Sequence, residues 1–163
     1  MTVSVVPIAE DHVDGFRAAV DAVARERRYL ALLEAPPLEE SRKFVAQNIG
    51  KGHPHYVALI AGQVVGWCDA LPYWQPTRAH TAVLGLGVLA AYRGQGIGKA
   101  LLHATLERAR AAGLTRIELT VRENNQRVAA LYERFGFVRE GIQRNAIRVD
   151  GKYESLLAMA LIL

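Results

Sequence analysis

Hydrophobic and polar positions recur with two different periods along the chain, and the change of period divides it into strands and helices. Apolar residues at 13, 16, 20 and 23 follow Asp11 at helical spacing, so we expect a helix with Asp11 as its cap. Residues 117–121 alternate between apolar and polar side chains, as in a strand with one buried face. The same reasoning predicts strands at 2–8, 56–60, 64–71, 80–89, 137–149 and 152–163, and helices at 38–49 and 97–112.

Glycine and asparagine residues mark where these elements begin and end. Gly50 and Gly113 close two helices, and the dipeptides at 61–62 and 150–151 are typical of tight hairpin turns between strands. A last helix follows Asn124 or Asn125, either of which can cap it, and is expected to bury its apolar side chains at 128, 131 and 135. The resulting order, β-α-α-β-β-β-α-β-α-β-β, predicts a mixed three-layer α/β fold. A chain of 163 residues without repeats or an interior linker fits a single domain, residues 1–163.

Composition narrows the classes of protein and of ligand. The net charge of +4 favours an anionic ligand, and no helix-turn-helix, zinc-finger spacing or aromatic-basic surface points to nucleic acid. The lone Cys68 excludes an internal disulfide and is expected to be an unreactive core thiol. The histidines lack the spacing of a metal site, so we expect no metal. With no long apolar segment and no signal-like N-terminus, we expect a cytoplasmic protein that does not bind a membrane.

The stretch from residue 93 to residue 98 concentrates three glycines where an apolar strand ends and a helix begins. Gly94, Gly96 and Gly98 allow a close approach of the backbone, and the free N–H groups at the helix start favour negative charge there. A P-loop is excluded because Lys99 is followed by alanine and not by a hydroxyl-bearing residue, and the third glycine of a dinucleotide fingerprint is missing. The segment therefore predicts a cradle for a diphosphate, with a plain strand-to-helix turn as the alternative.

Two segments carry a resemblance to a known family. The run R-G-Q-G-I-G at 93–98 resembles the acyl-CoA pyrophosphate loop of the GNAT superfamily of acetyl-CoA-dependent N-acetyltransferases. The run at 121–137, in which an asparagine precedes a helix that carries Tyr132, resembles the second signature of that superfamily. The resemblance extends over residues 56–163. It implies a mostly antiparallel central sheet in which the fourth and fifth strands are parallel and splay apart, with the pantetheine arm of acetyl-CoA between them.

The resemblance also implies roles for individual residues. Tyr132 would donate to the leaving thiolate, and the N–H of Val88 would polarise the acetyl carbonyl. Gly85 and Gly87 fit a bulge that frees the backbone of this strand for the coenzyme, the alternative being that they relieve packing against a neighbouring helix. The expected coenzyme-binding residues are Leu86, Val88, Arg93, Gly94, Gln95, Gly96, Ile97, Gly98, Lys99, Asn124 (or Asn125) and Tyr132.

The sequence indicates the general base and the acceptor site less clearly than it indicates the coenzyme site. Glu118 lies two residues from Thr120, where some relatives carry an acid, and Glu34 is the rival base. We expect Glu34, Tyr73 and Trp74 near the acceptor, which we take to be a small-molecule primary amine such as an amino acid. A protein N-terminal acetyltransferase and a non-catalytic acyl-CoA sensor are the alternatives, and a homodimer through the C-terminal hairpin is open.

Overall fold

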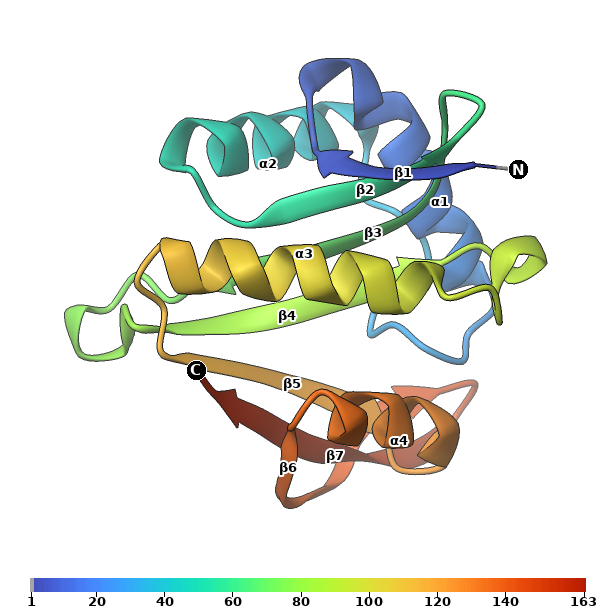
Figure 1. The fold of residues 1–163 in the computed structure, drawn as a ribbon. Helices are drawn as coiled ribbons and strands as arrows, with labels where there is room; N and C mark the ends of the chain where they lie inside the picture. The colour runs from blue at the N-terminus through green and yellow to red at the C-terminus, as the bar shows by residue number, and fades with distance from the viewer. Residues whose placement is uncertain (1) are drawn as a thin grey trace.

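The computed structural model describes residues 2–163 and forms one seven-stranded sheet with helices on both faces (Figure 1). The strands are β1 (Val3–Pro7), β2 (His55–Ile60), β3 (Gln63–Pro72), β4 (Thr81–Val88), β5 (Arg116–Arg122), β6 (Val138–Val149) and β7 (Lys152–Ile162). The helices are α1 (Val13–Arg25), α2 (Leu38–Lys51), α3 (Ile97–Ala111) and α4 (Gln126–Arg134), with short 3-10 turns at Glu10–His12, Pro76–Arg78 and Ala90–Tyr92. The order of strands and long helices is the one that the sequence predicts, and the strands lie in the order β1-β2-β3-β4-β5-β7-β6.

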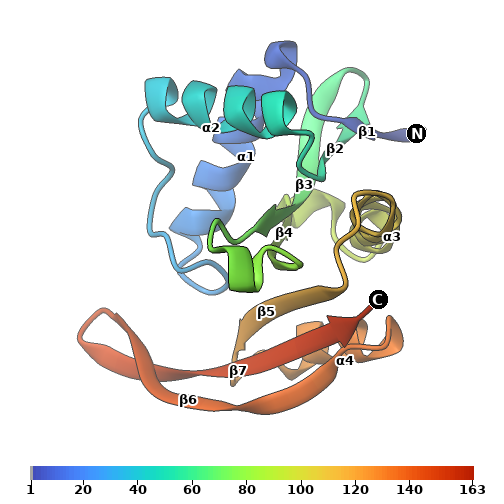
Figure 2. The ribbon, with the colours of Figure 1, turned by 90° about the vertical axis from the view of Figure 1, so that its left-hand side faces the viewer.

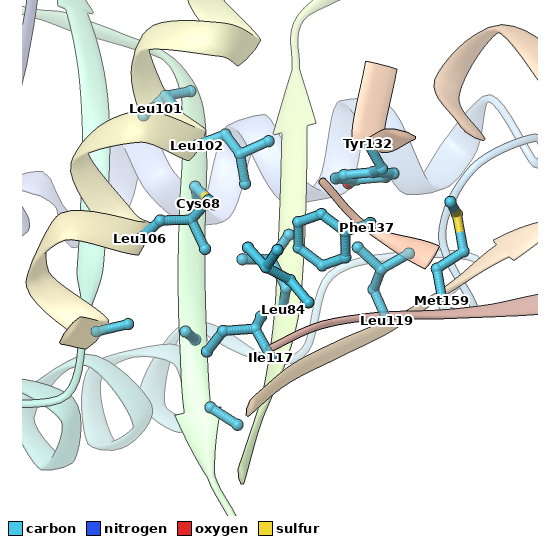
Figure 3. Packing of buried hydrophobic residues seen from close by; sticks show 14 of the residues in the cluster. Cys68, Leu84, Leu101, Leu102, Leu106, Ile117, Leu119, Tyr132, Phe137 and Met159 are labelled. Atoms are coloured by element: carbon cyan, nitrogen blue, oxygen red, sulfur yellow. The ribbon is translucent and has the colours of Figure 1, made fainter. Parts of the chain in front are cut away.

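Two hydrophobic cores hold the layers together, one on each face of the sheet. Figure 2 shows α1 and α2 on one side and α3 and α4 on the other. Side-chain alternation along β3 feeds both cores, since Trp67 packs with Phe16 of α1 whereas Cys68 packs with Leu101 of α3. Figure 3 shows the core on the face covered by α3 and α4, in which Leu84 of β4 lies among side chains from these helices and from the neighbouring strands.

The sheet opens between β4 and β5. These two strands are parallel, whereas every other neighbouring pair within residues 2–163 is antiparallel. Pairing is confined to three rows, in which Thr81, Ala82 and Val83 face Arg116, Ile117 and Glu118. Beyond these rows β5 stays with β7 and β4 stays with β3, so the second half of β4 has an unpaired edge.

This unpaired edge does not depend on a bulge. The register between β3 and β4 is continuous from Gly66↔Val88 to Pro72↔Ala82, so the predicted bulge at Gly85 and Gly87 is wrong. Gly87 instead makes room for a side chain, because a Cβ there would lie 2.6 Å from Cζ2 of Trp67. The neighbour is thus a strand residue and not a helix, and the separation of β4 from β5 is what frees the backbone.

Several predicted boundaries shift by a few residues. The N-cap of α1 is His12 and not Asp11, because a 3-10 turn precedes the helix. Helix α2 continues through Gly50 and ends at Gly52, whose φ of 68° closes it. Both hairpin turns are confirmed by positive φ at each central residue, at 61–62 and at 150–151. No helix within residues 2–163 combines the length and the apolar character needed to cross a membrane.

Helix α4 packs on a different stripe from the predicted one. Ala129 and Tyr132 are buried, whereas the side chains at 128, 131 and 135 are only half-buried. Of the half-buried residues, Val128 and Leu131 line the opening between β4 and β5, whereas Phe135 packs against the edge of the core.

The contact between Gly87 and Trp67 gives a stability test. Gly87→Ala should lower the free energy of unfolding by about 1–3 kcal/mol, because the indole ring must move out of a packed core. Urea denaturation of the two proteins measures the difference.

The matched control is Gly50→Ala, since Gly50 lies inside α2 with nothing within 4 Å of its added Cβ. This change should stabilise the protein by about 0.5–1 kcal/mol, because alanine is the better helix former. An equal effect of the two alanine substitutions would contradict the packing argument.

Candidate active site

The gap between β4 and β5 continues into one cavity of about 750 Å³. Its walls come from the second half of β4, the loop after it, the start of α3, the end of β5 and one side of α4. The segment after α1 and Ile147 of β6 close the remaining side. A cavity of this size holds a ligand of tens of atoms, and it joins an unpaired strand edge to a glycine-rich loop.

The backbone N–H groups of β4 alternate between β3 and the gap. Leu89 donates to the carbonyl of Val65, which fixes the odd-numbered residues of β4 as those bonded to β3. The N–H groups of Leu86 and Val88 therefore point away from β3 and toward the gap. Both residues line the cavity, as the sequence predicts for a strand that binds an extended ligand.

The glycine-rich loop forms the cradle at one end of the cavity. Gly94 and Gly96 have φ values of 76° and 81°, and a Cβ at either would meet nothing within 4 Å, so the space before them is free for a ligand. Gly96 is the N-cap of α3 and no side chain caps this helix, so its first N–H groups are available to an anion. Gln95 does not line the cavity, and its amide lies 3.5 Å from the carbonyl of Ala91.

Arg93 is held by groups other than the cradle. Its guanidinium forms a two-pronged ion pair with Glu26 at the end of α1, and its Nε donates to the carbonyl of Val88. The pairing raises the pKa of Arg93 and lowers that of Glu26, since each charge stabilises the other. The Arg93 side chain therefore connects α1 to the loop.

Free cations surround the cradle on the helices. Lys99 in the first turn of α3 and two residues of α4, Arg127 and Arg134, line the same cavity. The two arginines were missed by sequence reasoning, although their spacing on a predicted helix beside the cradle was a readable signal. With the net charge of +4, these cations make this end of the cavity suited to phosphate groups.

Tyr132 reaches the cavity from α4 through an apolar wall. The residue is 6% exposed, its ring lies 5.4 Å from that of Phe137, and Figure 3 shows Leu119 and Met159 on the same side. Burial raises the pKa of the Tyr132 hydroxyl, so the phenol stays protonated over the working pH range. A neutral hydroxyl beside an apolar surface can donate to a developing anion.

The two asparagines before α4 behave differently. Asn125 is the N-cap of α4 and lines the cavity, although its side chain makes no capping hydrogen bond. Asn124 does not line the cavity, and its amide donates to Glu154 over 3.3 Å. Of the two candidates that the sequence left open, the geometry favours Asn125.

Glu118 lies in the last paired row of β4 and β5, outside the cavity lining, and three groups hold its carboxylate. The hydroxyl of Tyr73 and the guanidinium of Arg78 donate to Oε1, and Arg116 donates to Oε2 through two nitrogens. These contacts hold the Glu118 carboxylate within its own cluster and outside the cavity lining, so the geometry does not favour it as the base.

The other predicted acceptor residues also lie outside the cavity lining. Trp74 is 85% exposed, Glu34 points to solvent beside Arg25, and Tyr73 is engaged with Glu118. Residues 29–31, which the sequence did not single out individually, line the cavity instead. Arg122 holds this segment, because its buried guanidinium donates to the carbonyls of Arg27 and Leu30 and pairs with Glu154.

A polar group is buried on the α1 face, directly beside the gap. The Asp69 carboxylate of β3 covers Gly85 of β4, where an added Cβ would lie 3.2 Å from its Oδ1. His55 of β2 places Nε2 3.9 Å from Oδ2 of Asp69, and its Nδ1 lies 3.1 Å from the amide nitrogen of Asn48. Burial raises the pKa of Asp69 to about 7 and lowers that of His55 to about 4.

Within residues 2–163 no group of histidine, cysteine and acidic side chains is arranged to hold a metal ion. Cys68 is fully buried against α3, and burial raises the pKa of its thiol, as expected for a core residue.

Comparison with known proteins agrees with this geometry. The model of the acetyltransferase (GNAT) family matches residues 18–137. The chain belongs to the GNAT acetyltransferase family. Its sheet, with a single parallel pair that parts beside a glycine-rich loop, is the fold of that family.

Individual GNAT relatives show how far the similarity extends. The N-alpha-acetyltransferase RimI of Mycobacterium tuberculosis is 36% identical over 106 residues, which are 64% of this chain and 65% of that protein. The L-amino acid N-acetyltransferase AaaT of Escherichia coli is 30% identical over 112 residues, 68% of this chain and 69% of that protein. The structure of yncA from Salmonella typhimurium with its cofactor acetyl-CoA has a TM-score of 0.94 at 16% identity, over 100% of this chain and 95% of that one.

The buried Asp69 predicts an unusual pH dependence of stability in this GNAT protein. A carboxyl whose pKa rises from 3.8 to about 7 on folding stabilises the folded state fully below pH 3.8, and this contribution is lost as the pH rises through 7. The Asp69→Asn protein has no carboxyl to ionise at this position and does not lose this stability as the pH rises. Its free energy of unfolding, measured relative to that of the wild type, should therefore increase by up to about 1.4 kcal/mol per pH unit between pH 3.8 and 7. Thermal or urea unfolding at several pH values between 4 and 8 measures the difference.

His55 provides the opposite test, because its lowered pKa contributes stability that is lost as the pH falls from 6.5 toward 4. His55→Gln should therefore gain stability relative to the wild type as the pH falls. Asp11→Asn is the control, because it makes the same replacement at an exposed position. A pH-independent difference for Asp69→Asn would show that the carboxyl is not buried as described.

Proposed function

We propose that this chain transfers an acetyl group from acetyl-CoA to a primary amine of a small molecule, by direct attack while both are bound. The observation that carries the proposal is the continuity of one cavity from the glycine-rich cradle along the unpaired edge of β4 to residues 29–31. Family membership supports the reaction class. The identity of 30% to the L-amino acid N-acetyltransferase AaaT supports a small amine such as an amino acid.

The cradle suits the diphosphate of coenzyme A. Main-chain N–H groups of Gly94, Gly96 and the first turn of α3 would bind the phosphate oxygens, and Lys99 would add a positive charge. Because the guanidinium of Arg93 is paired with Glu26, we assign to Arg93 a role in holding the loop, with only its backbone free to contribute to the cradle.

The unpaired strand edge suits the pantetheine arm and the thioester. The backbone groups of Leu86 would pair with the amides of the arm as an added strand does. The N–H of Val88 is positioned to stabilise negative charge on the acetyl oxygen. Val88 is fixed for this role, since its carbonyl accepts a hydrogen bond from Arg93.

Tyr132 would assist the departure of coenzyme A. Its protonated hydroxyl can donate a hydrogen bond and then a proton to the leaving sulfur. The apolar wall around the ring excludes water and keeps the hydroxyl in one place. Asn125, at the start of the same helix, is placed to contact the arm.

A protein N-terminus is the second candidate acceptor, and the identity of 36% to RimI favours it. An α-amine at the end of a peptide presents the same nucleophile as a free amino acid. A peptide acceptor differs in that the rest of the peptide must extend out of the site, past residues 29–31 or the turn of the β6–β7 hairpin. The cytoplasmic location and the homodimer stay predictions.

The function is tested by release of free thiol from acetyl-CoA with a panel of amines. The panel contains L-amino acids, aliphatic amines and short peptides with a free N-terminal alanine, and mass spectrometry identifies the acetylated product. We expect turnover with free amino acids in preference to peptides. Preferred turnover of peptides would favour the N-terminal acetyltransferase, and coenzyme binding with no thiol release from any amine would identify a sensor.

Gly96→Val tests the cradle. A β-branched residue at a φ of 81° is strained and fills the space in front of the loop, so the affinity for acetyl-CoA should fall at least about tenfold. Calorimetry with acetyl-CoA measures the loss.

Gly113→Val is its control, because Gly113 has a φ of 83° with nothing within 4 Å and lies at the opposite end of α3. It should cost similar folding stability and leave coenzyme affinity unchanged. Equal affinities of the Gly96 variant and the wild type would remove the cradle from the proposal.

Tyr132→Phe tests the assignment of the proton donor. Removing only the hydroxyl should lower turnover by about 10²- to 10⁴-fold and leave the affinity for acetyl-CoA nearly unchanged. Exposed Tyr153→Phe is the control. A large loss of coenzyme affinity would make Tyr132 a binding residue.

A further inference from the structure

A charged residue that the proposed mechanism has not used lies beside the reacting end of the cavity. Asp69 belongs to β3, and in the register of the sheet it is opposite Gly85 of β4. The last paired row of β4 and β5 joins Val83 to Glu118. Two residues further along each strand, Gly85 of β4 and Thr120 of β5 therefore face each other across the open gap. Asp69, Gly85 and Thr120 thus form one row on one face of the sheet.

Gly85 is the residue between the Asp69 carboxylate and this gap. Asp69 does not itself line the cavity, but it lies one strand behind Gly85, which does line it and carries no side chain to separate Oδ1 of Asp69 from that space. The Asp69 side chain is still 11% exposed although the residue is buried in the sheet. No hydrogen bond from a described residue reaches its oxygens, so they are free to accept one from a ligand.

Neighbouring side chains hold this carboxylate without neutralising it. The Asn48 amide beside Nδ1 of His55 places the ring proton on Nε2, which faces Asp69 at 3.9 Å and has no other partner. Phe16 of α1 and Phe44 of α2 pack edge-on against the same imidazole, with centroids 4.9 and 5.7 Å away. His55 is thereby kept neutral and fixed in orientation.

The side chains nearest to Asp69 come from β2, β4 and α1, and His55 is the titratable one among those described. His55 faces it from β2, β4 presents only glycines and Val83, and α1 presents Phe16. Cys68 points to the opposite face of β3, and the cluster of Tyr73, Arg78 and Glu118 lies further along the sheet with its charges paired within the cluster. No described arginine or lysine forms an ion pair with Asp69.

We propose that Asp69 is the proton acceptor for the amine and that His55 is the residue that positions it. The proposal rests on the proposed acetyltransferase function and names a residue that neither the two signatures nor the family match supplies. It explains how a chain with Thr120 on β5, and with Glu118 engaged by Tyr73, Arg78 and Arg116, can deprotonate its substrate.

The acceptor amine must lose a proton before its nitrogen can attack the thioester. The ammonium form of the acceptor gives one proton to the Asp69 carboxylate, directly or through one water, and the neutral nitrogen forms its bond to the acetyl carbon. The carbon–sulfur bond breaks, the sulfur receives a proton from Tyr132, and the new amide nitrogen loses its extra proton to restore that hydroxyl. Asp69 then returns its proton to solvent.

The working pH follows from the buried position of Asp69. A base with a pKa of about 7 is ionised above that pH, so kcat/KM should rise with pH through about 7 and then level off. Asp69→Asn should lower kcat/KM by about 10²-fold or more, abolish this rise and leave the affinity for acetyl-CoA unchanged. The assay uses the best amine of the panel described above.

Matched variants separate the proposed role from a structural one. His55→Gln should shift the midpoint of the pH profile while retaining part of the activity, because the base remains. Gly85→Val should cover Asp69 and lower kcat/KM as Asp69→Asn does, whereas exposed Asp11→Asn should leave the profile unchanged. Glu118→Gln distinguishes the rival base, since it should retain the rise near pH 7.

A readout without turnover accompanies these assays. In ¹³C NMR of the protein labelled at aspartate carboxyls, one resonance should titrate near pH 7 and be absent from the folded Asp69→Asn protein. Unchanged kcat/KM and pH profile in a folded Asp69→Asn variant would overturn the proposal even though the chain is an acetyltransferase. Absence of turnover with every amine in the wild type would instead refute the proposed function itself.

Discussion

The parting of β4 and β5 after three paired rows is the constraint on which the rest of the molecule depends. A sheet normally satisfies its backbone groups between strands, and an unpaired edge inside a protein is costly unless something else binds it. Here β4 is held by β3 and β5 by β7, so the two halves of the sheet separate without either strand losing its other neighbour. The unpaired N–H and C=O groups that result face a cavity, where a ligand with amide groups can satisfy them.

Everything else in the site is placed relative to this opening. Helix α3 starts at the loop that follows β4, so the free N–H groups of its first turn lie at the end of the same gap. Helix α4 follows β5, and its buried stripe sets the Tyr132 hydroxyl against the opposite wall. Two helix termini and two strands are thus brought to one place by the topology alone, without any long loop.

Local patterns were sufficient to predict the elements and the cradle, because glycine spacing and hydrophobic period act over a few residues. The element order and the two hairpin turns are confirmed. The bulge in β4 was wrong, because the sequence shows a glycine but not the Trp67 ring that occupies its space. Tyr73 and Trp74 are near in sequence to β4 but do not line the cavity, so their place at the acceptor stays a prediction.

Long-range pairing is what the sequence could not reveal. Asp69 and His55 are 14 positions apart in ordinary strand patterns, and only the register of β2, β3 and β4 brings them beside Gly85. In the same way, Arg93 belongs by its motif to the cradle, but its guanidinium is bound by Glu26, a residue 67 positions away. A motif identifies a backbone conformation more reliably than it identifies the partner of a side chain.

The ion pair between Arg93 and Glu26 links two parts of the site that would bind different molecules. Glu26 follows the last turn of α1 and shortly precedes residues 29–31, which line the cavity, while Arg93 begins the glycine-rich loop. The ion pair therefore restrains both segments at once. If the loop binds coenzyme A and residues 29–31 border the acceptor, as proposed, this restraint would link the two binding steps, and by thermodynamic linkage it would do so in both directions.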